Sequence, residues 1–236
     1  MYVMQETHKG ESLMPHQPST SETNRKLLIN ISLTIVMSCC WIGCSGRTQS
    51  QVFAYAVTTA IQEFQAQKED VREALDRAED AKREIEANMS FSDPRTQRFI
   101  DRWRQAEREV IRLRSAFDEV IKKTDFLFAY CEKKMRTIGN ESIRNRAATA
   151  IARKKEGLTK TAKDTHEVIN QLEATIREGN DVISGLEIAG ALNSLGDEIS
   201  TLGDLNTSAK QKLPELDALI KEGSSLLETE FGALGV

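Results

Sequence analysis

Proline and aromatic residues are scarce in this 236-residue sequence. It contains four prolines, two of them before residue 20, and aromatic residues make up 6% of the chain. So few large apolar side chains fill narrow seams rather than a thick core, and little proline means few interruptions to long helices. Ala, Glu, Lys, Arg and Leu, which favour helices, dominate instead. The composition therefore predicts an all-α protein without strands.

Histidine and cysteine are also rare, which argues against several classes of site. Only His166 lies beyond residue 16 among the three histidines, so a histidine triad or a multi-histidine metal site has nothing to be built from. Three of the four cysteines lie at positions 39, 40 and 44, and the remaining Cys131 cannot crosslink a domain alone. An unpaired Cys131 in an oxidising compartment would be buried or form an intermolecular disulfide, and because it falls on an apolar seam we expect it to be buried. We expect no enzyme, no metal and no cofactor.

The net charge of −4 conceals a segregation of charge along the chain. Residues 44–94 carry 6 basic and 10 acidic side chains, residues 95–163 carry 19 and 9, and residues 164–236 carry 4 and 14. Oppositely charged helices attract each other, although an exposed ion pair contributes only about 0–1 kcal/mol. We interpret the pattern as guiding the pairing of helices. A cationic face for anionic lipid or nucleic acid is the alternative. In the basic run from Arg98 to Arg114 the aromatic residues belong to the apolar seam, which argues against nucleic acid.

A segment with the features of an export signal lies near the N-terminus. Arg25 and Lys26 precede a stretch without charged residues from Leu27 to Gly46, and the apolar part of this stretch ends at Cys44. A basic region, an apolar region and a small residue before the cleavage point follow one another in export signals. Residues 25–44 are therefore predicted to direct the chain out of the cytoplasm.

The residues WIGC that end at Cys44 resemble the lipobox of bacterial lipoproteins. In that family the cysteine is lipidated and becomes the first residue of the mature chain. Gly43 and Cys44 match the pattern, whereas Trp41 stands where Leu, Val or Ile is usual. Cys39, preceded by VMS, fits locally, but cleavage there would leave the apolar CCWIGC at the mature start. Cys44 is thus the predicted lipidation site and Cys39 the reserve.

Two other interpretations of residues 25–44 stay open. About 20 uncharged residues suffice for an uncleaved membrane anchor, and an ordinary cleaved signal is the second alternative. The polar residues 1–24 are interpreted as a disordered leader or a mis-annotated start, with Met14 as the initiator. The lipoprotein resemblance, with Ser45 after the cysteine, implies a lipid-anchored protein of the cell envelope on the periplasmic face of the outer membrane.

Apolar residues recur at alternating steps of four and three along most of the chain, which is the heptad pattern of coiled coils. One series covers residues 57–89, a second 99–138 and a third, weaker one 151–186. Asp93 and Pro94 supply an N-cap and a first helical residue between the first two series. Gly139 and Asn140 supply the next break.

Five glycines recur between residues 179 and 203, where the repeat slips. Each lowers helix stability by about 1 kcal/mol relative to alanine, so we expect a segmented continuation there and a closing helix from Pro214. The short turns favour antiparallel hairpins. The predicted fold of residues 50–236 is an elongated antiparallel three-helix coiled-coil-like bundle with a short C-terminal helix. Its predicted helices occupy about residues 50–90, 94–138, 141–186, 190–203 and 213–231.

These expectations point to a membrane-tethered extracytoplasmic scaffold or interaction protein that is not an enzyme. Its expected partners are the membrane, through the lipid anchor, and another envelope protein or polymer, but no nucleic acid. Association of copies of the chain through their seams stays open. One alternative is a membrane-active helical protein that inserts into or remodels lipid through residues 182–205. Another is an enzyme or ligand-binding module with a pocket inside the bundle, which crowded seams without a polar cluster disfavour.

Overall fold

The computed structural model describes residues 49–85, 90–190 and 196–231. The chain divides into two units, residues 1–46 and 47–236, and all the described helices belong to the second. They are α2 (Gln49–Arg83), α3 (Pro94–Met135), α4 (Glu141–Gly190) and α5 (Gly196–Phe231). The first three begin within a residue of the predicted positions and end at Arg83, Met135 and Gly190 instead of near 90, 138 and 186. Within these ranges there are only helices and turns, which confirms the all-α prediction.

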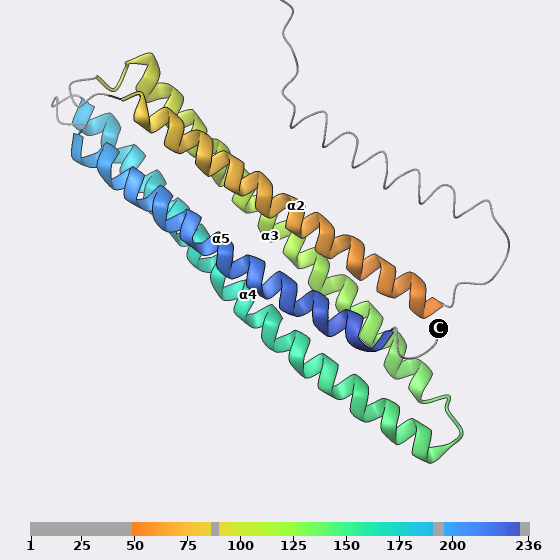
Figure 1. Cartoon of the computed structure of the whole chain (residues 1–236). Helices are drawn as coiled ribbons and strands as arrows, with labels where there is room; N and C mark the ends of the chain where they lie inside the picture. The colour runs from red at the N-terminus through yellow and green to blue at the C-terminus, as the bar shows by residue number, and fades with distance from the viewer. Residues whose placement is uncertain (1–48, 86–89, 191–195, 232–236) are drawn as a thin grey trace, which may run out of the picture. The chain divides into compact units, whose positions relative to one another are not determined.

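The four helices lie side by side, and each runs antiparallel to the next (Figure 1). Helix α2 packs on α3 and α4 packs on α5, and the two pairs meet through α3 with α4 and α2 with α5. This closed ring of neighbours is a four-helix bundle, so the predicted three-helix arrangement is not confirmed. The turn between α3 and α4, the start of α2 and the end of α5 share one end of the bundle, which we call the tip end (Figure 1).

The fourth member of the bundle differs from the prediction of separate helices at 190–203 and 213–231. Helix α5 runs unbroken from Gly196 to Phe231 with Pro214 in its interior. A proline inside a helix costs about 3 kcal/mol. Leu202, Leu213 and Leu216 are at most 1% exposed, and burying each such side chain contributes about 1.5–3 kcal/mol. Burial of this face outweighs the proline, so α5 continues through it.

Both predicted turns lie at their expected positions. Asp93 has an extended backbone, and its carboxylate accepts a hydrogen bond from the backbone N–H of Arg95 at 2.8 Å, just before Pro94 opens α3. The side-chain oxygen of Asn140 accepts a bond from the backbone N–H of Ile143 at 3.1 Å at the start of α4. These bonds satisfy amide groups that have no partner within the first turn of a helix.

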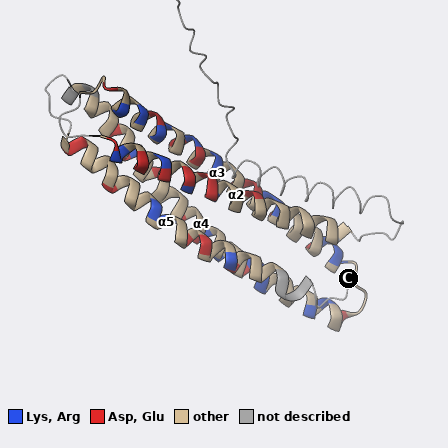
Figure 2. Ribbon diagram, turned by 45° about the horizontal axis from the view of Figure 1, so that its top comes forward, with Lys and Arg blue, Asp and Glu red and all other residues tan. Residues whose placement is uncertain are grey.

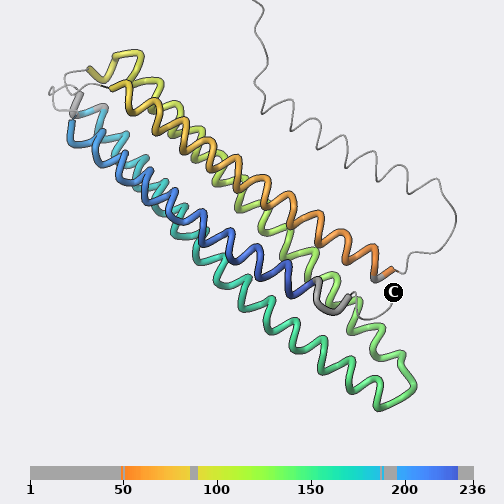
Figure 3. Tube along the Cα trace, viewed as in Figure 1, coloured from red at the N-terminus to blue at the C-terminus, as the bar shows by residue number. Residues whose placement is uncertain are grey.

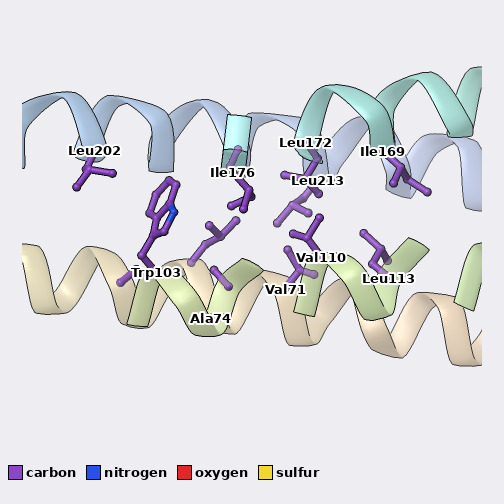
Figure 4. Close-up of a cluster of buried hydrophobic side chains, with 14 of the residues drawn as sticks. Val71, Ala74, Trp103, Val110, Leu113, Ile169, Leu172, Ile176, Leu202 and Leu213 are labelled. Atoms are coloured by element: carbon purple, nitrogen blue, oxygen red, sulfur yellow. The ribbon is translucent and has the colours of Figure 1, made fainter. Parts of the chain in front are cut away.

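The core consists largely of the predicted heptad positions. Figure 4 shows side chains of α3 projecting toward side chains of α4 and α5 between the helices. Six successive seam residues of α3 are at most 4% exposed: Phe99, Trp103, Ala106, Val110, Leu113 and Phe117. They share one cluster with buried residues of the other three helices. The predicted heptad seam of α3 is therefore confirmed in the middle of the bundle.

Trp103 packs directly against Gly179 of α4. The indole is fully buried, and a methyl group added at Gly179 would lie 2.0 Å from its Cζ2 atom. Heavy atoms in contact stay much farther apart, about 3.5–4.0 Å for two carbons. Gly179 interrupts the apolar repeat of the third series, and the structure shows that the packing of Trp103 requires it.

Lys68 occupies a core position of α2 and is 1% exposed. Its ammonium group forms ion pairs with Glu69 at 2.7 Å and with Asp217 of α5. Arg72 also pairs with Asp217, at 3.1 Å. A buried charge is tolerated when it is paired and hydrogen-bonded. Lys68, a charged residue at an apolar position of the first heptad series, therefore links α2 to α5.

Candidate functional site

The predicted lipidation site Cys44 and the reserve Cys39 lie outside the described residues, as do the predicted leader 1–24 and signal segment 25–44. Cys131 is described and is half-buried on α3, not buried as expected. Burial, with a smaller effect of Glu132, raises the pKa of its thiol. A raised pKa lowers the thiolate fraction and with it the reactivity of the sulfur.

The segment 182–205, the alternative membrane-active region, covers the end of α4 and the start of α5. Residues 191–195 lie outside the described ranges. Ile183, Leu186, Ile199 and Leu202 are at most 7% exposed and belong to the bundle core, whereas Ile188 is 70% exposed. Insertion into lipid would therefore require most apolar side chains of this segment to leave the core.

The α3–α4 hairpin projects past its neighbours at the tip end (Figure 3). The Lys154 ammonium donates to the backbone carbonyl of Leu226 at 2.8 Å, which aligns α4 with the last turns of α5. Thirteen residues of α4 precede Lys154 and five described residues of α5 follow Leu226, so α4 extends about 12 Å further at 1.5 Å per residue. Between Phe128 and Thr161 no residue is fully buried. We call residues 133–153 the tip.

The tip is strongly basic. Residues 133–153 contain six basic side chains and one acidic one, a net charge of +5. Figure 2 shows Lys and Arg at this end of the bundle. Within the described part of the chain, the following cations form no ion pair with a carboxylate: Lys133, Lys134, Arg136, Arg144, Arg146 and Arg153. Lys134 lies over its own helix's Tyr130 ring at 5.7 Å, and Arg144 donates to the carbonyl of Ile138.

Some cations in the middle of the bundle are paired between helices, in contrast to those of the tip. Arg114 of α3 donates from two nitrogens to the two carboxylate oxygens of Glu173 on α4, each at 2.9 Å. This hydrogen bonding holds the pKa of Glu173 below its ordinary value. The exposed His166 lies 3.1 Å from Arg114. Lys210 of α5 pairs with two acids of α2. The Arg114–Glu173 pair joins the basic segment 95–163 to the acidic segment 164–236, as the charge segregation predicts, whereas the Lys210 pairs join two acidic segments.

Exposed apolar side chains gather near the basic tip. Val52, Tyr55, Phe126 and Ile143 are between 46% and 53% exposed, and they make up four of the six exposed large apolar residues in the described ranges. Stacking of the α2 residue Phe53 on Tyr130, with ring centroids 5.2 Å apart, places the start of α2 beside the end of α3. The tip end therefore combines positive charge with apolar surface.

An apolar cavity of about 210 Å³ lies inside the tip end, and all four helices contribute to its lining. Phe64 and Phe117 contact each other on one side, with ring centroids 5.4 Å apart. Small residues of α4 and α5, namely Ala162, Thr165 and Gly223, also line it. The weak seam of the third heptad series thus has a structural counterpart, because small side chains at core positions leave space.

Thr161, Thr165 and Lys155, three of the polar residues that line the cavity, bond to other protein groups. Thr165 donates its hydroxyl to the carbonyl of Thr161 at 2.7 Å. Lys155 pairs with Glu132 at 2.9 Å, and this bond raises the pKa of the lysine and lowers that of the glutamate. An engineered apolar cavity of about 150 Å³ stays dry and binds benzene. The chemistry of this cavity therefore suits a small apolar guest.

Sequence reasoning missed both the cavity and the tip. The cavity had a signal in the third heptad series, where Lys155 and Thr165 replace large apolar residues at core positions. The tip had one too, since a single acid, Glu141, accompanies six cations in 21 residues. Neither signal indicated which cations pair across helices, because this depends on the register of the bundle.

No three histidine, cysteine or carboxylate side chains in the described ranges are grouped so as to hold a metal ion. Among helices α2 to α5, none has the length and apolar character that crossing a bilayer demands. No protein-family model, curated protein or solved structure matches the chain.

Proposed function

We propose that this chain is a membrane-tethered scaffold or interaction protein of the bacterial cell envelope, anchored by a lipid on Cys44. In this proposal the four-helix bundle is a stiff body that presents its surface to another envelope protein or polymer. Helices of 35 to 50 residues, about 50–75 Å long, set its reach. In this proposal the bundle binds a partner at a distance from the membrane and catalyses no reaction.

The observation that carries this proposal is the position of α2, which begins at Gln49, five residues after Cys44. A core of buried side chains then continues from Val57 through all four helices. A lipid on Cys44 would thus be coupled to a packed body through a very short connection. A diacylated cysteine supplies the two or more buried chains that stable anchoring needs.

Labelling with radioactive palmitate in cells, followed by fractionation, tests the anchor. Cys44→Ala is expected to abolish the label and to release the protein from the membrane fraction. Cys39→Ala is the matched control and is expected to keep the label. Loss of label in Cys39→Ala alone would move the site to Cys39. An unlabelled wild-type chain would refute the lipid anchor.

The interaction part of the proposal is tested by site-specific crosslinking in native envelopes. A photo-crosslinking residue at Ile188, which is 70% exposed near the end opposite the tip, is expected to capture a second envelope component. The same residue at Ile111, 58% exposed on the side of α3, serves as the comparison. Absence of adducts from both positions would contradict a scaffold that works through these surfaces.

A further inference from the structure

We propose that the tip, residues 133–153, binds the anionic surface of the membrane that carries the anchor. The inference rests on the proposed tether, because the tether selects a lipid surface over other anionic partners. The tip would then be a second attachment point beside the lipid on Cys44. Three observations carry the proposal: chain reach, unpaired charge and exposed apolar side chains.

The reach of the chain brings the tip end close to an anchored membrane. Gln49 is the fifth residue after Cys44, and a fully extended chain of five steps spans at most about 18 Å. The start of α2 lies beside the end of α3, as the Phe53–Tyr130 contact shows. Since α4 and α3 continue past this level, the tip is the part of the bundle that a membrane held at Cys44 would meet (Figure 3).

The charge of the tip is available for an external partner. Its six basic side chains have no ion pair to a described carboxylate, whereas Arg114 and Lys210 in the body of the bundle do. Each lysine or arginine near an anionic lipid surface strengthens binding by about fivefold, within a Debye length of the surface. Four such residues together are therefore worth a factor on the order of 100 or more.

The exposed apolar residues favour a lipid surface over a nucleic acid. Tyr55, Phe126, Ile143 and Val52 are about half exposed near the tip. Apolar and aromatic side chains gain free energy at the boundary between headgroups and acyl chains, where they leave water. Phosphate groups of a duplex offer no such environment to aliphatic side chains. Charge and apolar surface together therefore match a bilayer with anionic headgroups.

The test uses the full chain with Cys39→Ala and Cys44→Ala, so that neither candidate lipidation site carries an acyl chain. The tip variant also carries Lys133→Gln, Lys134→Gln, Arg136→Gln and Arg146→Gln, all at exposed positions. The matched control removes the same charge from exposed positions in the body of α3, with Arg98→Gln, Arg104→Gln, Arg108→Gln and Arg112→Gln. Cosedimentation is measured with phosphatidylcholine vesicles and with vesicles that also contain phosphatidylglycerol. Residues 27–46 are identical in all variants, so their contribution cancels.

The tip variant is expected to bind the anionic vesicles about 100-fold more weakly than its parent, and the control variant within about threefold of it. High salt should weaken binding of the parent. Equal losses in both variants, or none in the tip variant, would overturn the proposal. Tip-dependent binding to duplex DNA without preference for anionic vesicles would overturn it in favour of a nucleic acid. If the wild-type chain takes up no palmitate label and the tip variant still binds anionic vesicles more weakly than its parent, only the lipid anchor is refuted.

Discussion

Replacing Gly179 with alanine sets helix propensity against packing. Alanine in a helix interior is favoured over glycine by about 1 kcal/mol. The added methyl group would lie 2.0, 2.5 and 2.9 Å from Cζ2, Cε2 and Cη2 of Trp103, a rigid ring with 0% exposure. Overpacking of a core costs about 1–3 kcal/mol, and three close contacts point to the upper value. We expect a net loss of about 2 kcal/mol in the free energy of unfolding.

Urea unfolding followed by circular dichroism measures this loss, provided that the slope of the transition stays constant. Gly223→Ala is the matched control, because a methyl group there would meet Thr161 at an ordinary distance of 3.8 Å. It is expected to gain about 1 kcal/mol. The two glycine-to-alanine changes should therefore differ by about 3 kcal/mol although their propensity terms are the same.

A double-mutant cycle separates the clash from other effects. Trp103→Phe introduces a smaller ring without Cζ2 and Cη2, and it also removes a buried indole N–H that has no hydrogen-bond partner among the described residues. In this background Gly179→Ala should cost at least about 1 kcal/mol less than in the parent. If Gly179→Ala stabilises the chain as Gly223→Ala does, or if the two costs simply add, the close packing of indole and glycine is refuted.

Further measurements address the ion pairs and the thiol. Lys68→Ala should lower the free energy of unfolding by about 2–3 kcal/mol, because the buried aliphatic part of the side chain is lost. Lys68→Met keeps that part and should stay within about 1 kcal/mol of the parent. Equal losses for the two variants in urea unfolding would contradict this role of the aliphatic part. The hydrogen bond from Arg114 lowers the pKa of Glu173 in the folded chain below its ordinary value of 4.5. The pair therefore contributes its full stability above pH 4.5, and this contribution is lost as the pH falls through the pKa of folded Glu173. Glu173→Gln should therefore reduce the fall in the urea midpoint on acidification, and an unchanged profile would refute the coupling. Cys131 should react with a disulfide reagent more slowly in the folded chain than in denaturant, and equal rates would contradict its burial.

Sequence periodicity predicted the elements better than their assembly. The seam from Phe99 to Phe117 is buried as predicted, since apolar residues at heptad spacing form one stripe that leaves water when it packs against other helices. The fourth helix was predicted as two separate helices, at 190–203 and 213–231, because Pro214 and the recurring glycines lower local propensity. Contacts of Leu202 and Leu213 with other helices compensate for that loss, and such contacts cannot be read from a local window.

The candidate site was predictable only in part. Charge counting located the basic region of 95–163, but the sequence did not distinguish Arg114, paired with Glu173, from Arg146 on the tip. Cys131 was expected to be buried on its seam and is half-buried, because the core ends before the hairpin does. Helix lengths and bundle register, which set these differences, are tertiary properties.

An even number of helices returns the polypeptide to the side from which it started. Helix α5 ends at Phe231 on the tip end, where α2 begins, whereas an odd number would have left the two on opposite sides (Figure 1). The end of α2, the start of α3 and the adjoining ends of α4 and α5 are then the parts of the bundle farthest from the bilayer under the proposed tether. Under the same proposal, a reporter fused after α5 would lie near the lipid surface. A reporter inserted near residue 92 would report the largest distance of the bundle from that surface.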